Sequence, residues 1–304
     1  MRTEFTTVQA HAGTVVDYCR EGILSSGAVV FHQVSEHLYP GLRQLFSGLE
    51  HNLSIASVVE GNTLGCLYAD EPETAGAALL WNRQEALYLV GDPNRPGVLE
   101  GLQRLFHETI LPEARRRFIP LQSLQVHPTE WEAHLPTILD GCQIEKANRR
   151  LYLLQRGSVD FSSNPLPGYS LQRIDAQLLE SDLVNRDQVQ MWIESFWPST
   201  RAFLKRGFGF CVLGRYAVAS WCLSVFTSGN RYELGVATDE AYRNHGFAGL
   251  AAASCLKYCL EKGLVPEWHC WEDNFPSVRV AEKIGLQHTM SYPAFRFKTG
   301  LVEQ

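Results

Sequence analysis

The chain has 304 residues and a formal net charge of -6 at pH 7, with 45% hydrophobic and 20% charged residues. These values are typical of a globular protein, and the length predicts two domains, each large enough for its own core. The acidic balance, without any cluster of Lys and Arg, argues against a nucleic-acid-binding surface and leaves room for a cationic or amine substrate.

The start of the chain and its cysteines indicate the compartment. The first residues form no apolar signal region, and no apolar run is long enough to span a bilayer. The eight cysteines include no C-x-x-C pair. Cys255 and Cys259, four residues apart on a predicted helix, fit a small-residue face packed on a sheet better than a metal site. We therefore expect a cytoplasmic protein with no membrane segment and no metal.

The first half alternates strand-like and helix-like segments. Apolar runs predict strands at 27–31, 53–59, 77–81, 85–90 and 121–127. A long amphipathic helix is predicted over 98–117, and Pro128 is at a position that favours the start of another helix. This order of elements is typical of a mixed α/β domain.

A stretch rich in Ser, Pro and Gly, 156–167, predicts a linker between a first domain, 1–155, and a second, 168–304. The elements predicted in the second domain are helices at 180–196, 247–262 and 277–283 and strands at 207–213, 217–224, 232–238 and 267–271. The aromatic-rich segment 191–197 either packs in the core or lines an acceptor pocket.

The strand 232–238 has an unusual second face. Its residues alternate with a period of two, so Glu233, Gly235 and Ala237 share one side. That side offers one carboxylate beside two almost bare positions. A ligand could lie flat against it with the carboxylate at one end.

The loop after this strand has the pattern of an anion site. It reads Arg243-x-x-Gly246-x-Ala248 and leads into a helix. Amides in the first turn of a helix have no partner and point outward with the positive end of the dipole, so they can hold a phosphate. Gly246 lets the backbone approach an anion closely, and Arg243 adds a charged contact.

This strand, loop and helix resemble motif A of the GNAT acyltransferases, and Asn274-x-x-Ser277-x-x-x-Ala281-Glu282-Lys283-x-Gly285 resembles their motif B. The wider run from 207 to 285 is similar to the zwittermicin-A-resistance-like (ZmaR-like) branch of that superfamily, and the likeness covers 168–297. It implies an α/β (α+β) fold with a mixed, mostly antiparallel twisted sheet flanked by helices.

The resemblance also implies the ligand. The strand would hold the pantetheine arm of acetyl-CoA and the loop its pyrophosphate, with coenzyme A as the product. The cofactor-binding residues so implied are Val236, Ala237, Thr238, Arg243, Asn244, His245, Gly246, Phe247, Ala248, Gly249, Asn274 and Ser277.

Landmarks of the second half recur in the first at an offset of 148 positions. The pairs are Glu85 and Glu233, Arg95 and Arg243, and Pro128 and Pro276. A common offset predicts two tandem copies of one fold. In the first copy Pro93 and Pro96 remove two amides that a phosphate cradle would use. We interpret that copy as structural or substrate-shaping; a second working site is the alternative.

For the chemistry, the resemblance implies direct transfer to an amine within a ternary complex. Glu233, on the open face of its strand, is the predicted base, unless it is paired with a neighbouring Arg. Backbone amides near Val236 would polarise the thioester carbonyl.

One position departs from the family pattern. Many GNAT enzymes carry a tyrosine in motif B that protonates the departing thiolate, and here that position is Ala281. Either solvent or another side chain then protonates the thiolate. Tyr292 is the predicted side chain and His269 the other candidate, although each could be a packing or pocket residue.

The predicted partner is a small-molecule amine, with no nucleic acid and no membrane, and the chain is expected to be a monomer or homodimer. Two alternatives stay open. One is a non-catalytic acetyl-CoA-binding pseudoenzyme. The other is an acyltransferase with a non-acetyl donor such as aminoacyl-tRNA.

Overall fold

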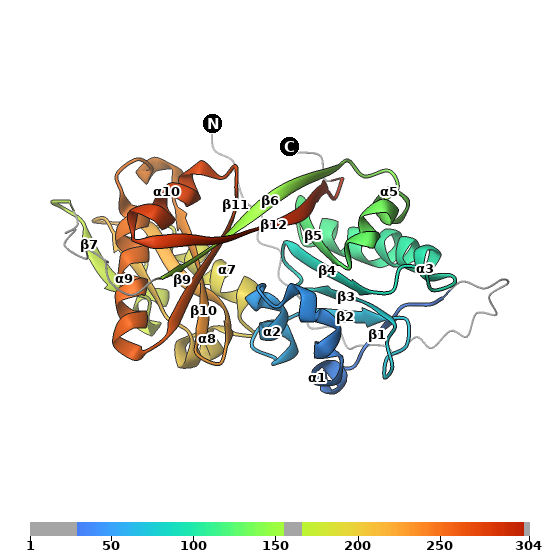
Figure 1. Cartoon of the computed structure of the whole chain (residues 1–304). Helices are drawn as coiled ribbons and strands as arrows, with labels where there is room; N and C mark the ends of the chain where they lie inside the picture. Colours follow the sequence, from blue (N-terminus) through green and yellow to red (C-terminus); the bar gives the residue numbers. More distant parts are fainter. Residues whose placement is uncertain (1–28, 155–165, 301–304) are drawn as a thin grey trace.

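A single sheet of twelve strands connects the two halves of the protein (Figure 1). The computed structural model describes residues 29–154 and 166–300. The strands are β1 His32–Gln33, β2 Cys66–Ala69, β3 Ala77–Trp81, β4 Ala86–Gly91, β5 Leu121–His127, β6 Ile144–Leu154, β7 Ser170–Arg173, β8 Gly209–Leu213, β9 Val218–Ser228, β10 Arg231–Thr238, β11 Val265–Trp271 and β12 Leu286–Lys298.

The spatial order is β1-β2-β3-β4-β5-β12-β6-β11-β10-β9-β8-β7. Among the pairs of these described strands, only β4–β5 and β10–β11 are parallel. The predicted fold class, a mixed and mostly antiparallel sheet flanked by helices, is confirmed.

Helices cover both faces of this sheet. They are α1 Tyr39–Leu42, α2 Leu53–Val59, α3 Val98–Leu105, α4 Leu111–Arg116, α5 Leu135–Ile138, α6 Ala176–Leu179, α7 Arg186–Phe196, α8 Thr200–Arg206, α9 Phe247–Lys262 and α10 Phe275–Lys283. Short 3-10 helices lie at Glu36–Leu38, Arg43–Leu49, Thr129–His134 and Glu240–Tyr242, and a π-helical segment, Phe106–Ile110, joins α3 to α4. The predicted helix 98–117 is therefore confirmed as one continuous helical segment that contains a short stretch of π-helix.

The two halves repeat one topology. In each, a helical segment connects two parallel strands, α3 and α4 between β4 and β5, and α9 between β10 and β11. The final strand of each half then joins the other half. β12 lies between β5 and β6, while β6 pairs with β11 (Figure 1). This exchange brings residues of β6 next to the strands of the second half.

The predicted strand 53–59 is wrong, because the segment is helix α2. The helix is enclosed by apolar neighbours from both halves: Leu53 belongs to the core of the second half, and Ile55 and Val58 to that of the first. Its serine hydroxyl groups form hydrogen bonds within the core; Oγ of Ser54 lies 2.6 Å from the hydroxyl oxygen of Tyr88. A short apolar run buried on all sides shows no period, so the sequence could not separate strand from helix.

Some boundaries also differ. Residues 29–31 of the predicted strand 27–31 are irregular, and a two-residue strand follows at His32–Gln33. The predicted helix 180–196 is reduced to α7, which starts at Arg186, with α6 lying before the segment. The predicted linker 156–167 lies almost wholly outside the described residues. Within the described ranges, no helix is both long and apolar enough to cross a membrane.

Candidate functional site

The parallel strands β10 and β11 separate after three residues. The paired positions are Arg231 with Val265, Tyr232 with Pro266 and Glu233 with Glu267. The pairing of β10 with β9 shifts register between Glu233 and Leu234, and such a bulge re-aims a strand. In the described part of the chain, no strand pairs with the β11-facing edge of β10 beyond Glu233. Its backbone groups are therefore available to a ligand.

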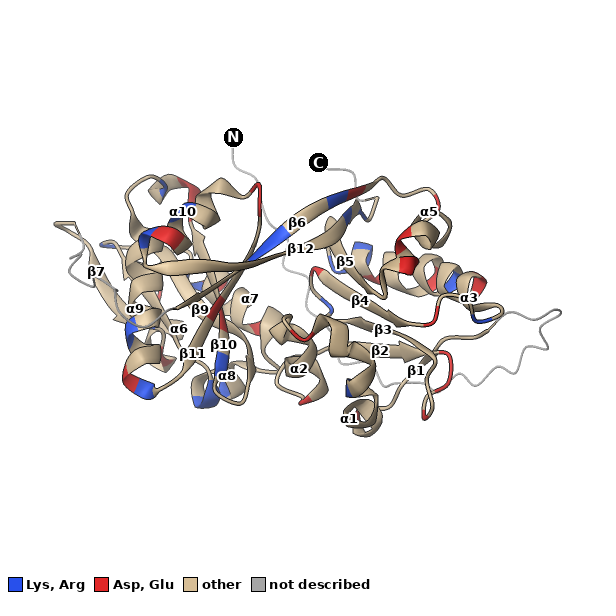
Figure 2. Cartoon of the chain, viewed as in Figure 1, with Lys and Arg blue, Asp and Glu red and all other residues tan. Residues whose placement is uncertain are grey.

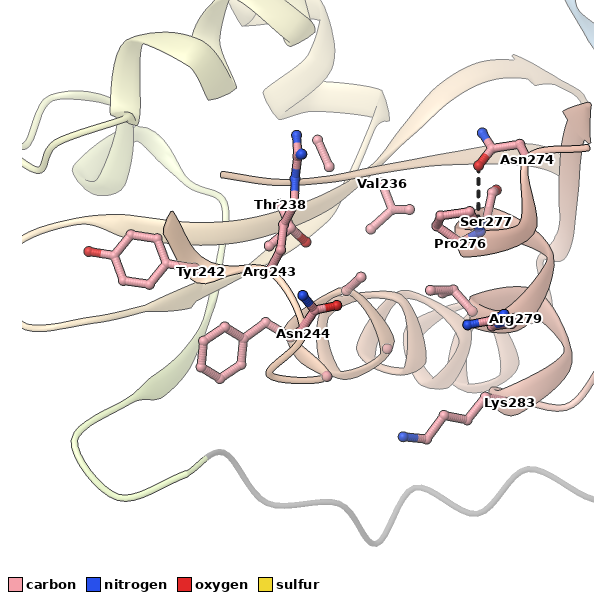
Figure 3. A pocket seen from close by; sticks show the side chains of 16 residues that line it. Val236, Thr238, Tyr242, Arg243, Asn244, Asn274, Pro276, Ser277, Arg279 and Lys283 are labelled. Carbon is pink, nitrogen blue, oxygen red and sulfur yellow. Dashed lines mark hydrogen bonds between the residues drawn. The ribbon is translucent and has the colours of Figure 1, made fainter. Parts of the chain in front are cut away.

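A cavity of about 630 Å³, which we call the first cavity, opens where the strands separate (Figure 3). Its wall contains all the residues predicted to bind the cofactor except His245. They are Val236, Ala237, Thr238, Arg243, Asn244, Gly246, Phe247, Ala248, Gly249, Asn274 and Ser277. Residues from β10, from the loop before α9 and from the start of α10 thus meet around one space.

His245 stabilises the loop from outside this wall. Its Nδ1 lies 2.8 Å from the carbonyl oxygen of Arg243, and its ring stacks on Phe247 at 5.4 Å. Its predicted contact with the cofactor stays a prediction.

The loop has the backbone geometry of an anion site. Asn244 and Gly246 are left-handed, with φ of 65° and 77°, and a Cβ at Gly246 would meet nothing within 4 Å. Helix α9 begins at Phe247 without a side-chain cap. Among the described residues, the amides of Phe247, Ala248 and Gly249 have no hydrogen-bond acceptor, and they lie at the positive end of the helix dipole. The residues present therefore fit a phosphate-bearing ligand.

Sequence reasoning missed part of the wall. The additional lining residues are Tyr242, Pro276, Arg279, Val280 and Lys283. Arg279 and Lys283 project from α10 and bring two further cations to the cavity (Figure 3). Their spacing of four residues places them on one face of a helix, which is a signal that the sequence contained.

A smaller space of about 270 Å³, the second cavity, adjoins the first, and Val236, Asn274 and Ser277 line both. Ionisable residues line part of it: Glu85, Arg149, Glu233 and His269. Another part is apolar, with Trp192, Phe196, Val225 and Phe226. The aromatic segment 191–197 therefore contributes side chains to this cavity. The sequence alone could not decide between this role and packing in the core.

Gly235 explains how an aromatic side chain enters the second cavity. A Cβ at Gly235 would lie 3.2 Å from Cζ3 of Trp192 and 2.8 Å from Cγ1 of Val225. The bare position on β10 is therefore covered by Trp192, and only glycine leaves room for it.

Glu233 lies beside two cationic side chains. It is buried, and burial raises the pKa of its carboxyl; the charges of His269 and Arg149 offset this only in part. A carboxylate with a raised pKa binds a proton more readily than an exposed one. Glu233 therefore has the position and the basicity of a proton acceptor for a group in the second cavity.

His269 is held between two groups. Its Nδ1 lies 2.7 Å from the Tyr292 hydroxyl, and its Nε2 lies 3.8 Å from Oε2 of Glu267. Glu267 in turn pairs with Arg231 through both carboxylate oxygens. Burial lowers the pKa of His269, but Tyr292 and the carboxylate of Glu233 outweigh it and raise that pKa to about 9. His269 is consequently a cation at neutral pH.

Tyr292, predicted as catalytic, lies behind this cluster. Its side chain is 5% exposed and is not part of the wall of the second cavity. Its hydroxyl accepts a hydrogen bond from Nε of Arg149 at 3.3 Å. Ala281, at the position of the family tyrosine, is buried in the core of the second half. Tyr292 therefore contacts the second cavity only through His269 and Arg149.

The first half has a different environment at the equivalent loop. Nε of Arg95 lies 2.7 Å from Oδ2 of Asp70, whose carboxylate is buried. A Cβ at Gly76 would meet the same guanidinium. Among the described residues, Arg243 of the second half pairs only with the exposed carboxylate of Glu240, at 3.7 Å, and is itself 60% exposed beside the first cavity. The pairing of Arg95 is consistent with a structural role for the first loop.

No cluster of three or more His, Cys, Asp or Glu suited to a metal ion occurs within 29–154 and 166–300.

Comparison with known proteins identifies the family. The GNAT acetyltransferase family matches residues 43–295. This chain belongs to the GNAT acetyltransferase family. A curated relative, the uncharacterized N-acetyltransferase YdfB of Bacillus subtilis (strain 168), is 24% identical over 266 residues, which are 88% of this chain and 98% of YdfB.

Solved GNAT structures share the fold. A GCN5-related N-acetyltransferase-like protein from Streptococcus suis 89/1591 has a TM-score of 0.64 and 22% identity, over 86% of this chain and 98% of its own. A tandem GNAT protein from the clavulanic acid biosynthesis pathway has a TM-score of 0.54 and 13% identity, and the match covers 90% of this chain and 99% of that protein. These likenesses concern the fold, and the family match over residues 43–295 makes the chain an acetyltransferase of the GNAT type.

Proposed function

We propose that this enzyme transfers the acetyl group of acetyl-CoA to an amine of a small-molecule acceptor, directly, within a ternary complex. The observation that carries this proposal is the junction of the two cavities. Val236, Asn274 and Ser277 line both, at the point where β10 separates from β11. Two reactants held in adjoining spaces need no covalent enzyme intermediate, and positioning alone can supply several kcal/mol.

The first cavity is the proposed donor site. Acetyl-CoA would supply an activated thioester there. The free amides at the start of α9, together with Arg279 and Lys283, would hold its phosphates. The open edge of β10 beyond Glu233 offers backbone partners for an amide-containing arm and, near Val236, for the thioester carbonyl.

The second cavity is the proposed acceptor site. Glu233 takes a proton from the ammonium group, directly or through water, and the neutral amine attacks the thioester carbon. The C–N bond forms, the C–S bond breaks, and the nitrogen gives up its second proton to solvent. The departing thiolate then needs a proton, which we assign to His269, since its pKa of about 9 keeps it charged at neutral pH. Tyr292 orients the His269 ring and so remains in the proposal as a positioning residue.

Release of the CoA thiol with a panel of small amines tests this proposal. We expect release that depends on the amine and on the folded chain. Binding of acetyl-CoA without release for any amine would favour the pseudoenzyme. Figure 2 shows Lys and Arg interspersed with Asp and Glu over both halves, which gives little support to an aminoacyl-tRNA donor. Filter binding with tRNA at low salt would reveal that donor.

Several finer assignments belong to the same proposal. We infer that the chain is two GNAT copies in tandem, 1–155 and 168–304, because both halves repeat one strand and helix order. We place 168–297 in the ZmaR-like branch on the motif resemblance. We also expect a cytoplasmic monomer or homodimer that uses no metal.

A further inference from the structure

The second cavity continues into the first half of the chain. A third cavity, of about 300 Å³, shares Glu85 and Phe196 with it. Most of its wall is the apolar segment Phe118 to Leu121, which leads from α4 into the first residue of β5, with Gln84 beside it. A ligand that extends from Glu233 past Glu85 and Phe196 would therefore reach a surface of the first half.

Phe118 occupies a position where the fold would favour glycine. It has a left-handed φ of 57°, and its amide donates to the carbonyl of Arg115 at 3.0 Å, while the amide of Ile119 donates to that of Ala114 at 2.9 Å. These two bonds form the hydrogen-bond pattern that ends a helix with a left-handed residue. A side chain at such a φ costs stability that glycine avoids.

The equivalent helix end of the second half has that glycine. Gly263 ends α9 with a φ of 67°, its amide donates to the carbonyl of Leu260, and the amide of Leu264 donates to that of Cys259. Phe118, by contrast, is 83% exposed, so it adds almost nothing to the core. Neither the helix end nor the packing accounts for this aromatic side chain. Its place on the wall of the third cavity offers an account.

We propose that the third cavity binds the apolar tail of an elongated acceptor amine. This inference rests on the proposed function and specifies its substrate class. The amino group reaches Glu233, and an aromatic or aliphatic chain passes Phe196 and lies on Phe118 and Leu121. Glu85, the counterpart of Glu233 in the first half, lines both cavities; it is 61% exposed, lies 3.9 Å from Nη1 of Arg149, and adds a negative charge that favours a cationic amine. The first half then shapes the substrate site.

Calorimetry with benzylamine and phenylhexylamine on the full chain tests this. The wild type should bind phenylhexylamine more tightly, and Phe118→Gly should weaken that binding by about tenfold or more, the scale of one buried aromatic contact. Benzylamine affinity should not change. The same variant should melt at a higher temperature, because glycine suits the left-handed position. Tyr216→Ser, which removes another aromatic side chain that is 66% exposed, serves as the matched control.

Equal wild-type affinity for the two amines, or no measurable binding of either, would overturn the assignment. Unchanged phenylhexylamine affinity in Phe118→Gly would do so too, as would a lower melting temperature. Because these are binding measurements, they can be interpreted even if no acetyl group is transferred. Conversely, if the rate of thiol release were the same for amines with and without an apolar tail, the proposed function would stand and only the tail-binding site would be refuted.

Discussion

Replacing Glu233 by glutamine separates a catalytic carboxylate from a structural one. Glu233→Gln keeps the shape of the side chain and removes its basicity. Since Glu233 lies in the second cavity and not in the first, acetyl-CoA affinity should barely change. The turnover number should fall by roughly 10²–10⁴, the usual contribution of a general base, which corresponds to about 2.7–5.4 kcal/mol in activation free energy.

The pH dependence gives the sign of the effect. Burial raises the pKa of Glu233, so the wild-type rate should fall as pH decreases through that raised pKa. Glu233→Gln should lack this acid limb and should recover part of its rate at high pH, where more of the amine is neutral. A raised folded pKa also means that the contribution of Glu233 to folding is complete below its ordinary value of 4.5 and is lost as pH rises through the folded pKa. At neutral pH the variant should therefore melt no lower than the wild type.

The assay combines thiol release over a range of pH, acetyl-CoA calorimetry and thermal melting. Glu261→Gln, on an exposed part of α9, controls for the substitution itself. A well-folded Glu233→Gln enzyme with turnover within a few-fold of wild type would refute the base assignment. A lower melting temperature with normal turnover would show a structural ion pair instead.

Three further predictions follow from the site. Arg279→Glu should weaken acetyl-CoA binding by about tenfold or more in calorimetry at low salt, whereas Lys262→Glu at the far end of α9 should not; equal effects would deny a local phosphate contact. Gly235→Ala should overpack Trp192, cost about 1–3 kcal/mol of stability and raise the KM for the amine alone; an unchanged KM would separate Trp192 from the acceptor. His269 has a folded pKa of about 9 against 6.5 unfolded, so it should stabilise the fold by roughly 3 kcal/mol below pH 6.5, and this contribution should be lost as pH rises through 9. Urea denaturation of wild type and His269→Gln across that range checks it, and parallel curves would contradict it.

The sequence predicted the parts of the site that are contiguous in the chain. Helix α9 was predicted with both its ends, because Gly246 and Gly263 adopt the left-handed conformations that bound it. The strand and loop before it carried a local pattern, and nearly every residue of that pattern lies on the wall of the first cavity.

The parts that depend on distant pairing were not predicted. Arg149 reaches the second cavity because β6 of the first half pairs with β11 of the second, and no local pattern encodes that neighbour. Glu85 was noticed only as a repeat of Glu233, and its place in the same cavity follows from the joined sheet. Helix α2 was missed for another reason, since its uniform burial removes the period on which helix prediction depends.

The central claim is that one donor site, in the second half of the chain, serves an acceptor site to which both halves contribute. Calorimetric titration of acetyl-CoA into the intact protein tests it most directly. The account predicts a stoichiometry near one per chain, because Arg95 of the first half is engaged by Asp70 while the loop of the second half is open. Two equivalent sites, or no binding at all, would contradict it.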